Sequence, residues 1–569
     1  MNTKVVTGAE AFLHVLADMG VDHIFASPGS EWAPVWEFLA RPEWQARLRY
    51  LSSRHEEVAI SMASGYAKAT GKLPAVMLHG SVGALHAAMG LRAAHHENIP
   101  MVVFAGESIG FGEEGGLDPG WIWLRLVADN GGPARLVAPF VKWSFGVNAK
   151  AVFQATIQRA CQIAMSEPRG PAFVSVPMEF LLDTMANSAP AAAAIPIPAS
   201  ADSGGIEQLS ALLAGAADPV IVTENCGRSP VAVERLVELA ELLGAPVVET
   251  RSPGYVNFPR AHPLHAGFDT EQVVKDAGLV FMLDTVAPWH PASAGPRPGV
   301  KVVALSENPL REELPFWGYR VDLCVTGALQ NSMEMLLESM KKRVKRGEAR
   351  RIKSAERWGK RHEERVRKLK DEALACKQTK PLDTRWVAHE LNQVLPADAL
   401  VVDETITHRP VILSQLDRLR PGTPFAGYLG GLGTGLGTAL GVKAAAPERP
   451  VIALIGDGSF SYNPVIAALG FAQEYGMPIL IVMFNNFGYL SMKRGIPAYF
   501  PDGWAVRSKT FVGTSIVPSP DYAAVARAFD GYGETVEEPS EVRASLERGL
   551  KAMAEGRLAL LDMRLQPVN

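Results

Sequence analysis

Short apolar runs alternate with amphipathic stretches along most of the 569-residue chain. Such runs, bounded by glycine or proline, are typical of buried strands, and the longer stretches between them fit helices. In the first 185 residues the predicted strands are HIFAS (23–27), AVMLHG (75–80), MVVFAG (101–106) and AFVSVP (172–177). This alternation predicts a parallel sheet covered by helices.

The same alternation returns twice further along the chain. A second α/β unit is predicted, with a helix over 229–243 and strands near 219–223, 246–250, 279–284 and 301–305. A third unit begins near residue 381 and contains the apolar runs VIALIG (451–456) and PILIVMF (478–484). The expected fold class is α/β with three doubly wound parallel-sheet domains.

Changes in amino-acid composition indicate where the linkers between these units lie. Residues 188–205 are rich in Ala, Pro and Ser and lack periodicity, which is typical of a linker. Residues 341–370 hold fifteen Lys or Arg against four Glu, which predicts a basic helix with a solvated face or, alternatively, a surface for an anionic partner. The expected domains are 1–187, 188–340 and 381–569, with a basic helical linker over 341–380.

Overall composition favours an ordinary soluble protein. With 47% hydrophobic residues, 20% charged residues and a net charge of -4, no bias toward nucleic acid or membrane is indicated. The four cysteines form no Cys-x-x-Cys pair, so neither a disulfide framework nor a zinc site is expected. The chain opens with a capping-box pattern, Thr7 with Glu10, and not with a cleavable apolar segment, so we expect a cytoplasmic location.

The most informative chemistry lies in the third unit, where Asp457 stands between glycines directly after one predicted strand. Asn486 follows the next predicted strand, so a carboxylate and a carboxamide are expected at neighbouring strand ends. Magnesium prefers about six oxygen ligands. Asp457, Asn486 and the Gly488 carbonyl would supply three, and two phosphate oxygens and a water would complete the shell. The sequence therefore predicts a Mg²⁺ site beside a diphosphate.

A helix is expected soon after this turn. Glycines on both sides of Asp457 would let backbone amides approach phosphate oxygens closely. Asn463 and Pro464 suit the cap and the first position of a helix whose positive end faces the anion.

Six further stretches extend this picture: SPGSEW (27–32), RHEEVAISMASGYAKATG (54–71), LHGSVGALHAAMG (78–90), WHP (289–291), DETIT (403–407) and GGLG (430–433). Together with the Asp457 turn, they resemble the thiamin-diphosphate-dependent decarboxylases and carboligases over nearly the whole chain. Within that family the motifs are most similar to those of benzoylformate decarboxylases. The resemblance implies a pyrimidine-binding domain, a central domain and a diphosphate-binding domain, in that order, with thiamine diphosphate and Mg²⁺ as cofactors.

The resemblance also implies roles for individual residues. Glu56 would share a proton with the pyrimidine N1′ of the cofactor, while its neighbour Glu57 is expected on the helix surface because adjacent helical residues point in different directions. Gly430 would offer a carbonyl to the 4′-amino group, and Leu432 would hold the two rings in a V shape. Further cofactor contacts are implied for Glu404, Thr407, Gly458, Ser459, Asn486, Tyr462 and Tyr489.

For the substrate, the resemblance implies three polar side chains, Ser30, His79 and His290. The serine would hold a carboxylate and the histidines would relay protons, because histidine titrates near working pH. His55, His86, His95 and His96 are expected to be structural.

The implied reaction is non-oxidative decarboxylation of a 2-keto acid through a C2 adduct and an enamine that is protonated to release an aldehyde, with carboligation to a 2-hydroxy ketone as the variant. One alternative is acetolactate-synthase-like carboligation, since PFVKWS (139–144) resembles that group. The central domain has LDTVAPWHP (283–291) where that group has its flavin contact, so no FAD is expected. Another alternative is a non-catalytic homologue that binds cofactor or a partner through residues 341–370.

Two regions depart from the benzoylformate decarboxylase pattern. Ser491, Met492 and Gly495 fall where an apolar helix lines the aromatic pocket in benzoylformate decarboxylases. The sequence therefore does not specify an aromatic side chain for the substrate. The stretch 113–132, with two tryptophans, has no counterpart and could reshape the pocket. The resemblance finally implies a homodimer or homotetramer in which Glu56 and Asp457 reach one cofactor from different subunits.

Overall fold

The computed structural model describes residues 5–110, 117–124, 130–187, 194–344, 348–426 and 431–567. It divides into two compact units, the first comprising 1–197, 428–447 and 463–475 and the second comprising the remaining residues. The described residues contain three parallel sheets and one two-stranded antiparallel ribbon. This arrangement confirms the expected α/β class with several parallel sheets.

The first unit holds a six-stranded parallel sheet in the order β3-β2-β4-β5-β7-β6. Its strands, with the antiparallel pair β1 and β8, are β1 (Val5–Thr7), β2 (His23–Ser27), β3 (Arg49–Ser52), β4 (Ala75–Leu78), β5 (Met101–Glu107), β6 (Trp143–Gly146), β7 (Pro171–Pro177) and β8 (Thr184–Ala186). Its helices are α1 (Gly8–Asp18), α2 (Ala33–Leu39), α3 (Pro42–Gln45), α4 (Glu56–Thr70), α5 (Gly80–His96), α7 (Pro133–Val137), α8 (Phe153–Met165), α9 (Met178–Leu182), α17 (Gly435–Ala445) and α19 (Val465–Glu474).

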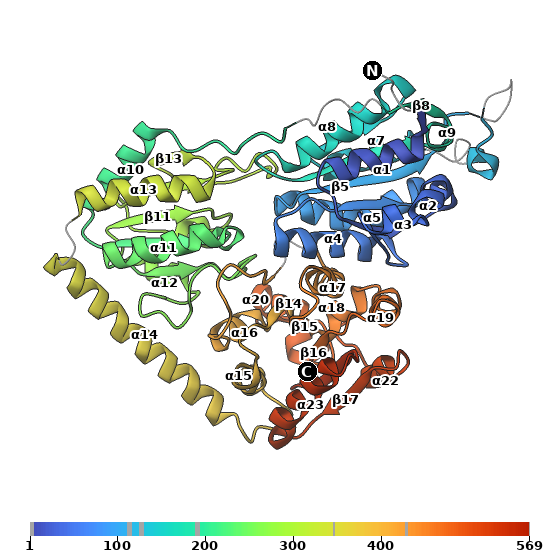
Figure 1. The fold of residues 1–569 in the computed structure, drawn as a ribbon. Coiled ribbons are helices and arrows are strands. Elements are labelled where there is room, and N and C mark those ends of the chain that lie inside the picture. Colours follow the sequence, from blue (N-terminus) through green and yellow to red (C-terminus); the bar gives the residue numbers. More distant parts are fainter. Residues whose placement is uncertain are drawn as a thin grey trace. The chain divides into compact units, whose positions relative to one another are not determined.

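Helices cover both faces of this sheet (Figure 1). One face packs against α1 and α8 through a core that includes Phe12 and Phe104, and the other face meets α4, where Phe25 contacts Tyr66. The predicted cap holds, because Thr7 Oγ1 accepts a hydrogen bond from Glu10 N at 3.2 Å. Helix α4 ends at Gly71, whose φ of 70° requires the left-handed conformation that glycine adopts without strain.

The central sheet of the second unit has the order β10-β9-β11-β12-β13. Its strands are β9 (Pro219–Thr223), β10 (Val247–Glu249), β11 (Leu279–Leu283), β12 (Lys301–Ser306) and β13 (Leu323–Thr326). The helices of this region are α10 (Ser203–Gly215), α11 (Pro230–Leu243), α12 (Thr270–Lys275), α13 (Leu329–Arg343) and α14 (Ala349–Ala375). The basic stretch 341–370 therefore spans the end of α13 and most of α14.

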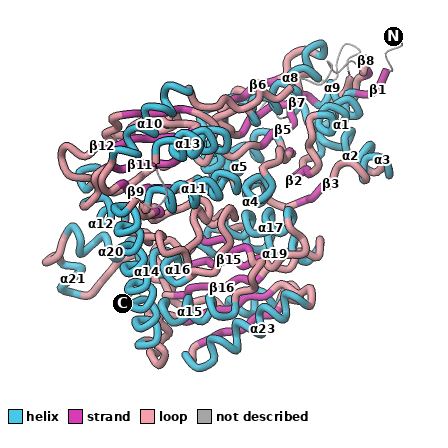
Figure 2. The backbone as a smooth tube through the Cα atoms, turned by 60° about the vertical axis from the view of Figure 1, so that its left-hand side comes forward, coloured by secondary structure: helices cyan, strands magenta, loops and turns pink. Residues whose placement is uncertain are grey.

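The last sheet has the order β14-β15-β16-β18-β17. Its strands are β14 (Leu400–Glu404), β15 (Val451–Gly456), β16 (Leu480–Asn485), β17 (Tyr532–Val536) and β18 (Ala559–Arg564). Its helices are α15 (Thr384–Val394), α16 (Arg409–Gln415), α18 (Asp457–Tyr462), α20 (Leu490–Tyr499), α21 (Trp504–Ser508), α22 (Tyr522–Arg527) and α23 (Val542–Ala554). In Figure 2, β15 and β16 run side by side, and α15, α16 and α23 share one core with this sheet.

The predicted helix cap after the Asp457 turn is wrong. Helix α18 begins at Asp457 itself, and the residue that caps α19 is Pro464. Asn463 serves a different helix, because its Oδ1 accepts a hydrogen bond from Leu436 N, in the first turn of α17, at 3.0 Å. A side-chain oxygen satisfies an amide at a helix start equally well when it comes from a distant segment. In the part of the chain described, no helix is long and apolar enough to cross a membrane.

Candidate active site

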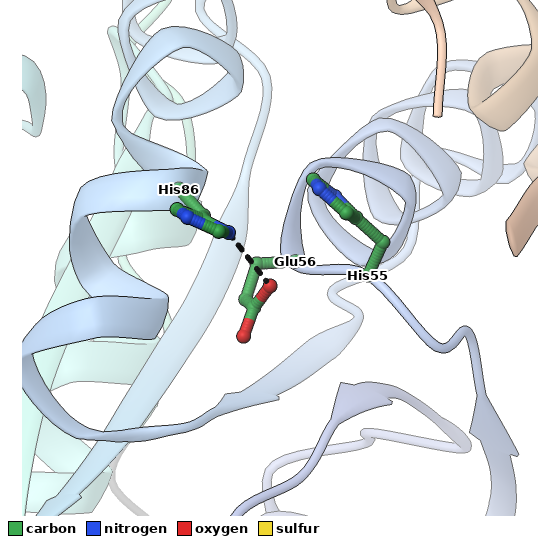
Figure 3. A group of neighbouring side chains, drawn as sticks. All are labelled: His55, Glu56 and His86. Carbon is green, nitrogen blue, oxygen red and sulfur yellow. Dashed lines mark ion pairs between the residues drawn. The ribbon is translucent and has the colours of Figure 1, made fainter. Parts of the chain in front are cut away.

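In the first unit, Glu56 is the first residue of α4, directly after a tight turn in which Arg54 has a φ of 64°. Its side chain is 13% exposed, and its Oε2 lies 3.4 Å from Nδ1 of His86 (Figure 3). The ring of His86 stacks on that of His55, with centroids 5.4 Å apart. His55 Nδ1 accepts the amide of Glu57 at 3.1 Å, which places its ring proton on Nε2. Both histidines were expected to be structural, yet they surround the candidate proton donor.

Glu57 is not on the helix surface as expected. It is buried between α4 and α5, where its Oε1 accepts from Ser61 Oγ and its Oε2 from Gly90 N, both at 3.2 Å. The sequence argument correctly predicted that the side chains of Glu56 and Glu57 point in different directions. It assigned the wrong environment to Glu57 because α5 covers that face of α4.

The second group in this unit centres on Glu31, which is fully buried. Its carboxylate lies 3.0 Å from Nδ1 of His79 and accepts the amide of Gly80 at 2.9 Å. When Nδ1 donates to this carboxylate, Nε2 of His79 is the basic nitrogen of the ring. Ser30, the neighbour of Glu31, is exposed at the start of the same turn. The structure thus brings the Ser30 turn and His79 together.

Two glycines make room for this arrangement. A Cβ added to Gly29 would lie 1.6 Å from Nδ1 of His79, and one added to Gly106 would lie 1.9 Å from Cγ of Glu31. Sequence reasoning missed Glu31, although it belongs to the quoted SPGSEW stretch. The available signal was a carboxylate within an otherwise apolar and small-residue turn.

In the second unit, Asp457 and Asn486 lie at the carboxyl ends of the paired strands β15 and β16. The amide of Gly488 donates to Oδ2 of Asp457 at 2.9 Å and to Oδ1 of Asn486 at 3.2 Å. Burial raises the pKa of Asp457 to about 6, which a nearby cation would reverse. These clustered oxygens fit a hard cation such as Mg²⁺.

His408, which the sequence reading did not select, orients Asn486. Its Nε2 lies 2.9 Å from Nδ2 of Asn486, and its Nδ1 lies 2.9 Å from Oγ1 of Thr384. The amide nitrogen can only donate, so Nε2 of His408 must accept and Oδ1 of Asn486 points away toward Gly488. Burial lowers the pKa of His408 to about 4, consistent with a neutral ring. No sequence motif marked this residue, because it approaches from a separate strand end.

The remaining cofactor candidates of this unit lie on the same strand ends or nearby. Glu404 is buried at the end of β14, and Thr407 is half-buried in the following turn. Ser459 is buried in α18, behind Gly458, whose added Cβ would lie 2.9 Å from Cδ1 of Tyr489. The rings of Tyr462 and Tyr489 meet edge to face, with centroids 6.5 Å apart.

Four further expectations concern other residues. His290 is exposed in the loop after β11. Leu432 is half-buried in the segment before α17, and Gly430 lies outside the described residues. Of the stretch 113–132, the described part includes the exposed Trp121.

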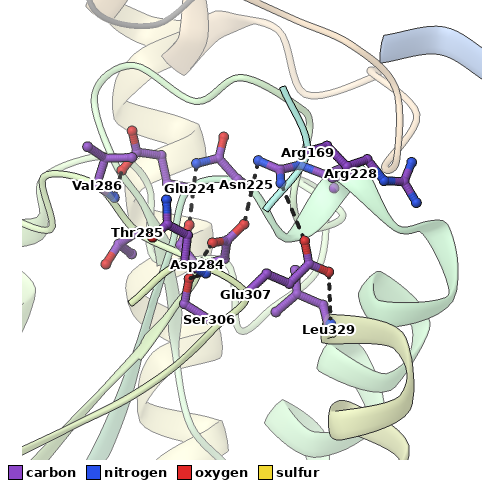
Figure 4. A network of polar contacts seen from close by, with 12 residues as sticks. Arg169, Glu224, Asn225, Arg228, Asp284, Thr285, Val286, Ser306, Glu307 and Leu329 are labelled. Carbon is purple, nitrogen blue, oxygen red and sulfur yellow. Dashed lines mark hydrogen bonds and ion pairs between the residues drawn. The ribbon is translucent and has the colours of Figure 1, made fainter. Parts of the chain in front are cut away.

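A buried charge network occupies the carboxyl ends of β9, β11 and β12 (Figure 4). Asp284 Oδ1 accepts from Arg311 Nη2 at 3.0 Å and from Ser306 Oγ at 2.8 Å. Glu224, fully buried, accepts the amides of Val286 and Ala287 at 2.7 and 3.2 Å. In doubly wound sheets this edge is a common place for a ligand. Here its acidic groups are paired, because Arg228 lies near Asp284 and Glu307 and Arg311 contacts Asp284.

Comparison with known proteins assigns this fold and these motifs to a family. The family model of the N-terminal TPP binding domain of thiamine pyrophosphate enzymes matches residues 6–112, and that of the C-terminal TPP binding domain matches 408–563. Benzoylformate decarboxylase of Pseudomonas aeruginosa is 27% identical over 98% of this chain and 99% of its own length. The acetolactate synthase isozyme 3 large subunit of Escherichia coli is 24% identical over 98% of this chain and 95% of its own.

A solved structure supports the fold. The thiamine diphosphate-dependent 4-hydroxybenzoylformate decarboxylase of Rhodococcus jostii aligns over 99% of both chains with a TM-score of 0.77 at 23% identity. Both matched family models describe TPP binding domains. The chain therefore belongs to the thiamine pyrophosphate enzymes and is a thiamine diphosphate-dependent enzyme.

Proposed function

We propose that this enzyme decarboxylates a 2-keto acid without oxidation, taking up one proton and releasing carbon dioxide and an aldehyde. The observation that carries the proposal is the buried Glu31 carboxylate, which accepts from Nδ1 of His79 beside the Ser30 turn and so makes Nε2 the basic nitrogen of that ring. Bound thiamine diphosphate would supply a nucleophilic carbon that attacks the keto group and a cationic ring that accepts the electron pair left by carbon dioxide.

The chain's own residues would bind the groups and move the protons. Asp457, Asn486 and the Gly488 carbonyl would hold Mg²⁺ and through it the diphosphate, with Gly458, Ser459 and Thr407 on the phosphates. Glu56 would hold a proton at the pyrimidine. Ser30 would bind the substrate carboxylate, and His79 and His290 would carry protons to and from the reacting oxygen and carbon.

Carboligation is the second candidate, supported by the full-length similarity to an acetolactate synthase. In that case the same residues act, but a second carbonyl compound replaces the proton. We also propose a homodimer or homotetramer in which Glu56 and Asp457 serve one cofactor from two subunits.

The test is carbon dioxide release from a panel of aliphatic and aromatic 2-keto acids, with thiamine diphosphate and Mg²⁺, in the presence and absence of pyruvate as acceptor. Aldehyde equal to carbon dioxide supports decarboxylation. A 2-hydroxy ketone that replaces the aldehyde supports carboligation. If the cofactor binds by calorimetry and neither product forms from any substrate, both candidates fail and a non-catalytic role is favoured.

A further inference from the structure

The second unit contains a cavity of about 480 Å³ that none of the proposed catalytic or cofactor residues line. Its walls are the loop between β10 and α12, the basic helix α14, and helices α15 and α16 with the residues that follow α16. Pockets that hold small organic molecules measure roughly 300–1,000 Å³. The cavity is therefore large enough for a small organic ligand.

Cationic side chains outnumber anionic ones along this wall. The charged lining residues are Arg251, Arg260, Arg365, Lys370, Asp269 and Asp417. Asp417 is already engaged, because its Oδ1 accepts a hydrogen bond from Asn392 at 2.7 Å. The charge of the lining therefore favours an anion.

Two of the guanidinium groups are wholly or partly withdrawn from solvent, since Arg260 is buried and Arg365 is half-buried. Arg260 is 3% exposed, its Nη1 donates to Leu416 O at 2.9 Å, and its Nε lies 3.6 Å from Oε1 of Glu249. Among the described residues its Nη2 has no hydrogen-bond partner. Desolvation lowers the pKa of both Arg260 and Arg365, that of Arg365 to about 10, while Glu249 opposes the shift in each. Both guanidinium groups have therefore lost part of their hydration and favour a nearby anion.

Arg365 reaches this place from the basic helix. Its Nη2 donates to the carbonyl of His265 at 2.9 Å, and its Nη1 lies close to Gly267, whose φ of 87° favours glycine. Burial lowers the pKa of His265 to about 4, so its ring adds no charge. The apolar part of the wall consists of Phe268, Val366, Leu369, Pro410, Leu413 and Leu416.

We propose that this cavity binds an organic carboxylate with an apolar body, the carboxylate beside Arg260 and Arg365 and the body against Phe268 and α14. The carboxylate would accept from Nη2 of Arg260, which has no hydrogen-bond partner among the described residues. The same arrangement explains part of the basic stretch 341–370, because α14 contributes Arg365 and Lys370 to a ligand site. The site is separate from the proposed substrate groups Ser30, His79 and His290, so it suits an effector.

Calorimetric titration of benzoate into the enzyme loaded with thiamine diphosphate and Mg²⁺ tests the proposal. Benzamide, which has the same shape without the charge, is the matched ligand. We expect benzoate to bind and benzamide not to bind. Arg365→Gln and Lys370→Gln should each weaken benzoate binding about tenfold or more, whereas their exposed neighbours in Arg367→Gln and Lys368→Gln should not change it.

A variant that fills the cavity without altering charge separates this site from the substrate site. Ser414→Phe, on the α16 wall, should abolish benzoate binding while its melting temperature stays near that of the wild type. Ser30→Ala should leave benzoate binding intact. Equal binding of benzamide, or benzoate binding that survives both Arg365→Gln and Ser414→Phe, would overturn the proposal. Because heat of binding is measured without turnover, the result is independent of the reaction proposed above.

Discussion

At the scale of single residues, neighbouring carboxylates have different environments. Glu56 and Glu57 are adjacent, yet Glu56 faces His86 at the partly open end of α4 and Glu57 is buried with two hydrogen-bond donors. Only the first is free to serve a cofactor. The difference follows from the direction in which each side chain leaves the helix.

Glu56→Gln should still bind thiamine diphosphate but lose about 100-fold or more of kcat, because an amide cannot share a proton with the pyrimidine. Asp457→Ala should instead lose Mg²⁺-dependent cofactor binding. Calorimetry and initial rates distinguish the two variants. Full turnover by Glu56→Gln would remove the role proposed for this residue.

Glu31→Gln should lower kcat about 10-fold or more with little change in KM. In the glutamine, an amide NH2 group that takes the place of Oε2 faces Nδ1 of His79 as a second donor, so the ring loses the acceptor that fixes its tautomer. Nitrogen-15 NMR of His79 should show the changed tautomer, a readout that simple destabilisation would not produce. Glu37→Gln, an exposed glutamate on α2, is the control. An unchanged tautomer and kcat in Glu31→Gln would show that Glu31 does not position His79.

At the scale of elements, helices α4 and α17 pack by placing glycines directly against backbone. A Cβ at Gly441 would lie 1.9 Å from the carbonyl oxygen of Met62, and one at Gly65 would lie 2.1 Å from that of Thr438. Close approach of these helices fixes α4, whose first residue is Glu56. The position of Glu56 therefore depends on Gly65 and Gly441, which allow α4 and α17 to approach closely.

Gly441→Ala should destabilise the protein by about 1–3 kcal/mol and reduce activity, because the added methyl group forces the two helices apart. Thermal unfolding and initial rates measure both effects. Gly215→Ala is the matched control: it ends helix α10, has nothing within 4 Å of its added Cβ, and should be neutral or slightly stabilising. Equal melting temperatures for the two variants would contradict the packing argument.

Glu224, at the carboxyl end of β9 in the central sheet, should make the stability of the protein depend on pH. Burial raises the pKa of Glu224 from 4.5 to about 7. Between these values the folded protein holds a proton that the unfolded chain has released, so the free energy of unfolding falls as pH rises across that window.

Glu224→Gln removes this titration. Relative to the wild type, its stability should gain up to about 3 kcal/mol between pH 4.5 and pH 8. Melting temperatures measured at several pH values in this range provide the check, with the exposed Glu234→Gln on α11 as control. Parallel pH profiles for wild type and Glu224→Gln would refute the assignment.

At the scale of the whole molecule, the proposed cofactor groups belong to two compact units, with Glu56 in the first and Asp457 in the second. If one cofactor uses Glu56 of one subunit and Asp457 of another, two inactive variants can complement each other. Each mixed dimer of Glu56→Gln and Asp457→Ala subunits contains one site with both residues intact.

Co-expressing these two variants in equal amounts, with different purification tags, should therefore restore about a quarter of wild-type activity, since half of randomly paired dimers are mixed and each has one working site of two. The purified mixed dimer should show half. Absence of activity in a purified mixed dimer that binds cofactor would show that each site is built within one chain.

Much of this protein was determined by local sequence. The strands HIFAS and VIALIG are found over the predicted residues, and the helix predicted over 229–243 is α11, because continuous apolar runs and caps act within a few residues. The pairing of Asp457 with Asn486 also followed from sequence, since both directly follow buried strands. Strands without a strong apolar run, such as β17 (YGETV), were not predicted.

Only the tertiary structure decided which distant groups meet. His408 orients Asn486, Glu31 holds His79, and Asn463 caps α17, and each contact joins segments that no local pattern relates. The sequence alone established the cofactor family and the candidate ligands, because motif residues adjoin the strands that position them. Other side chains fix the tautomer of each histidine, the direction of each carboxamide and the protonation of each carboxylate. Folding brings these side chains together and buries them, and the order of residues alone does not show which ones meet.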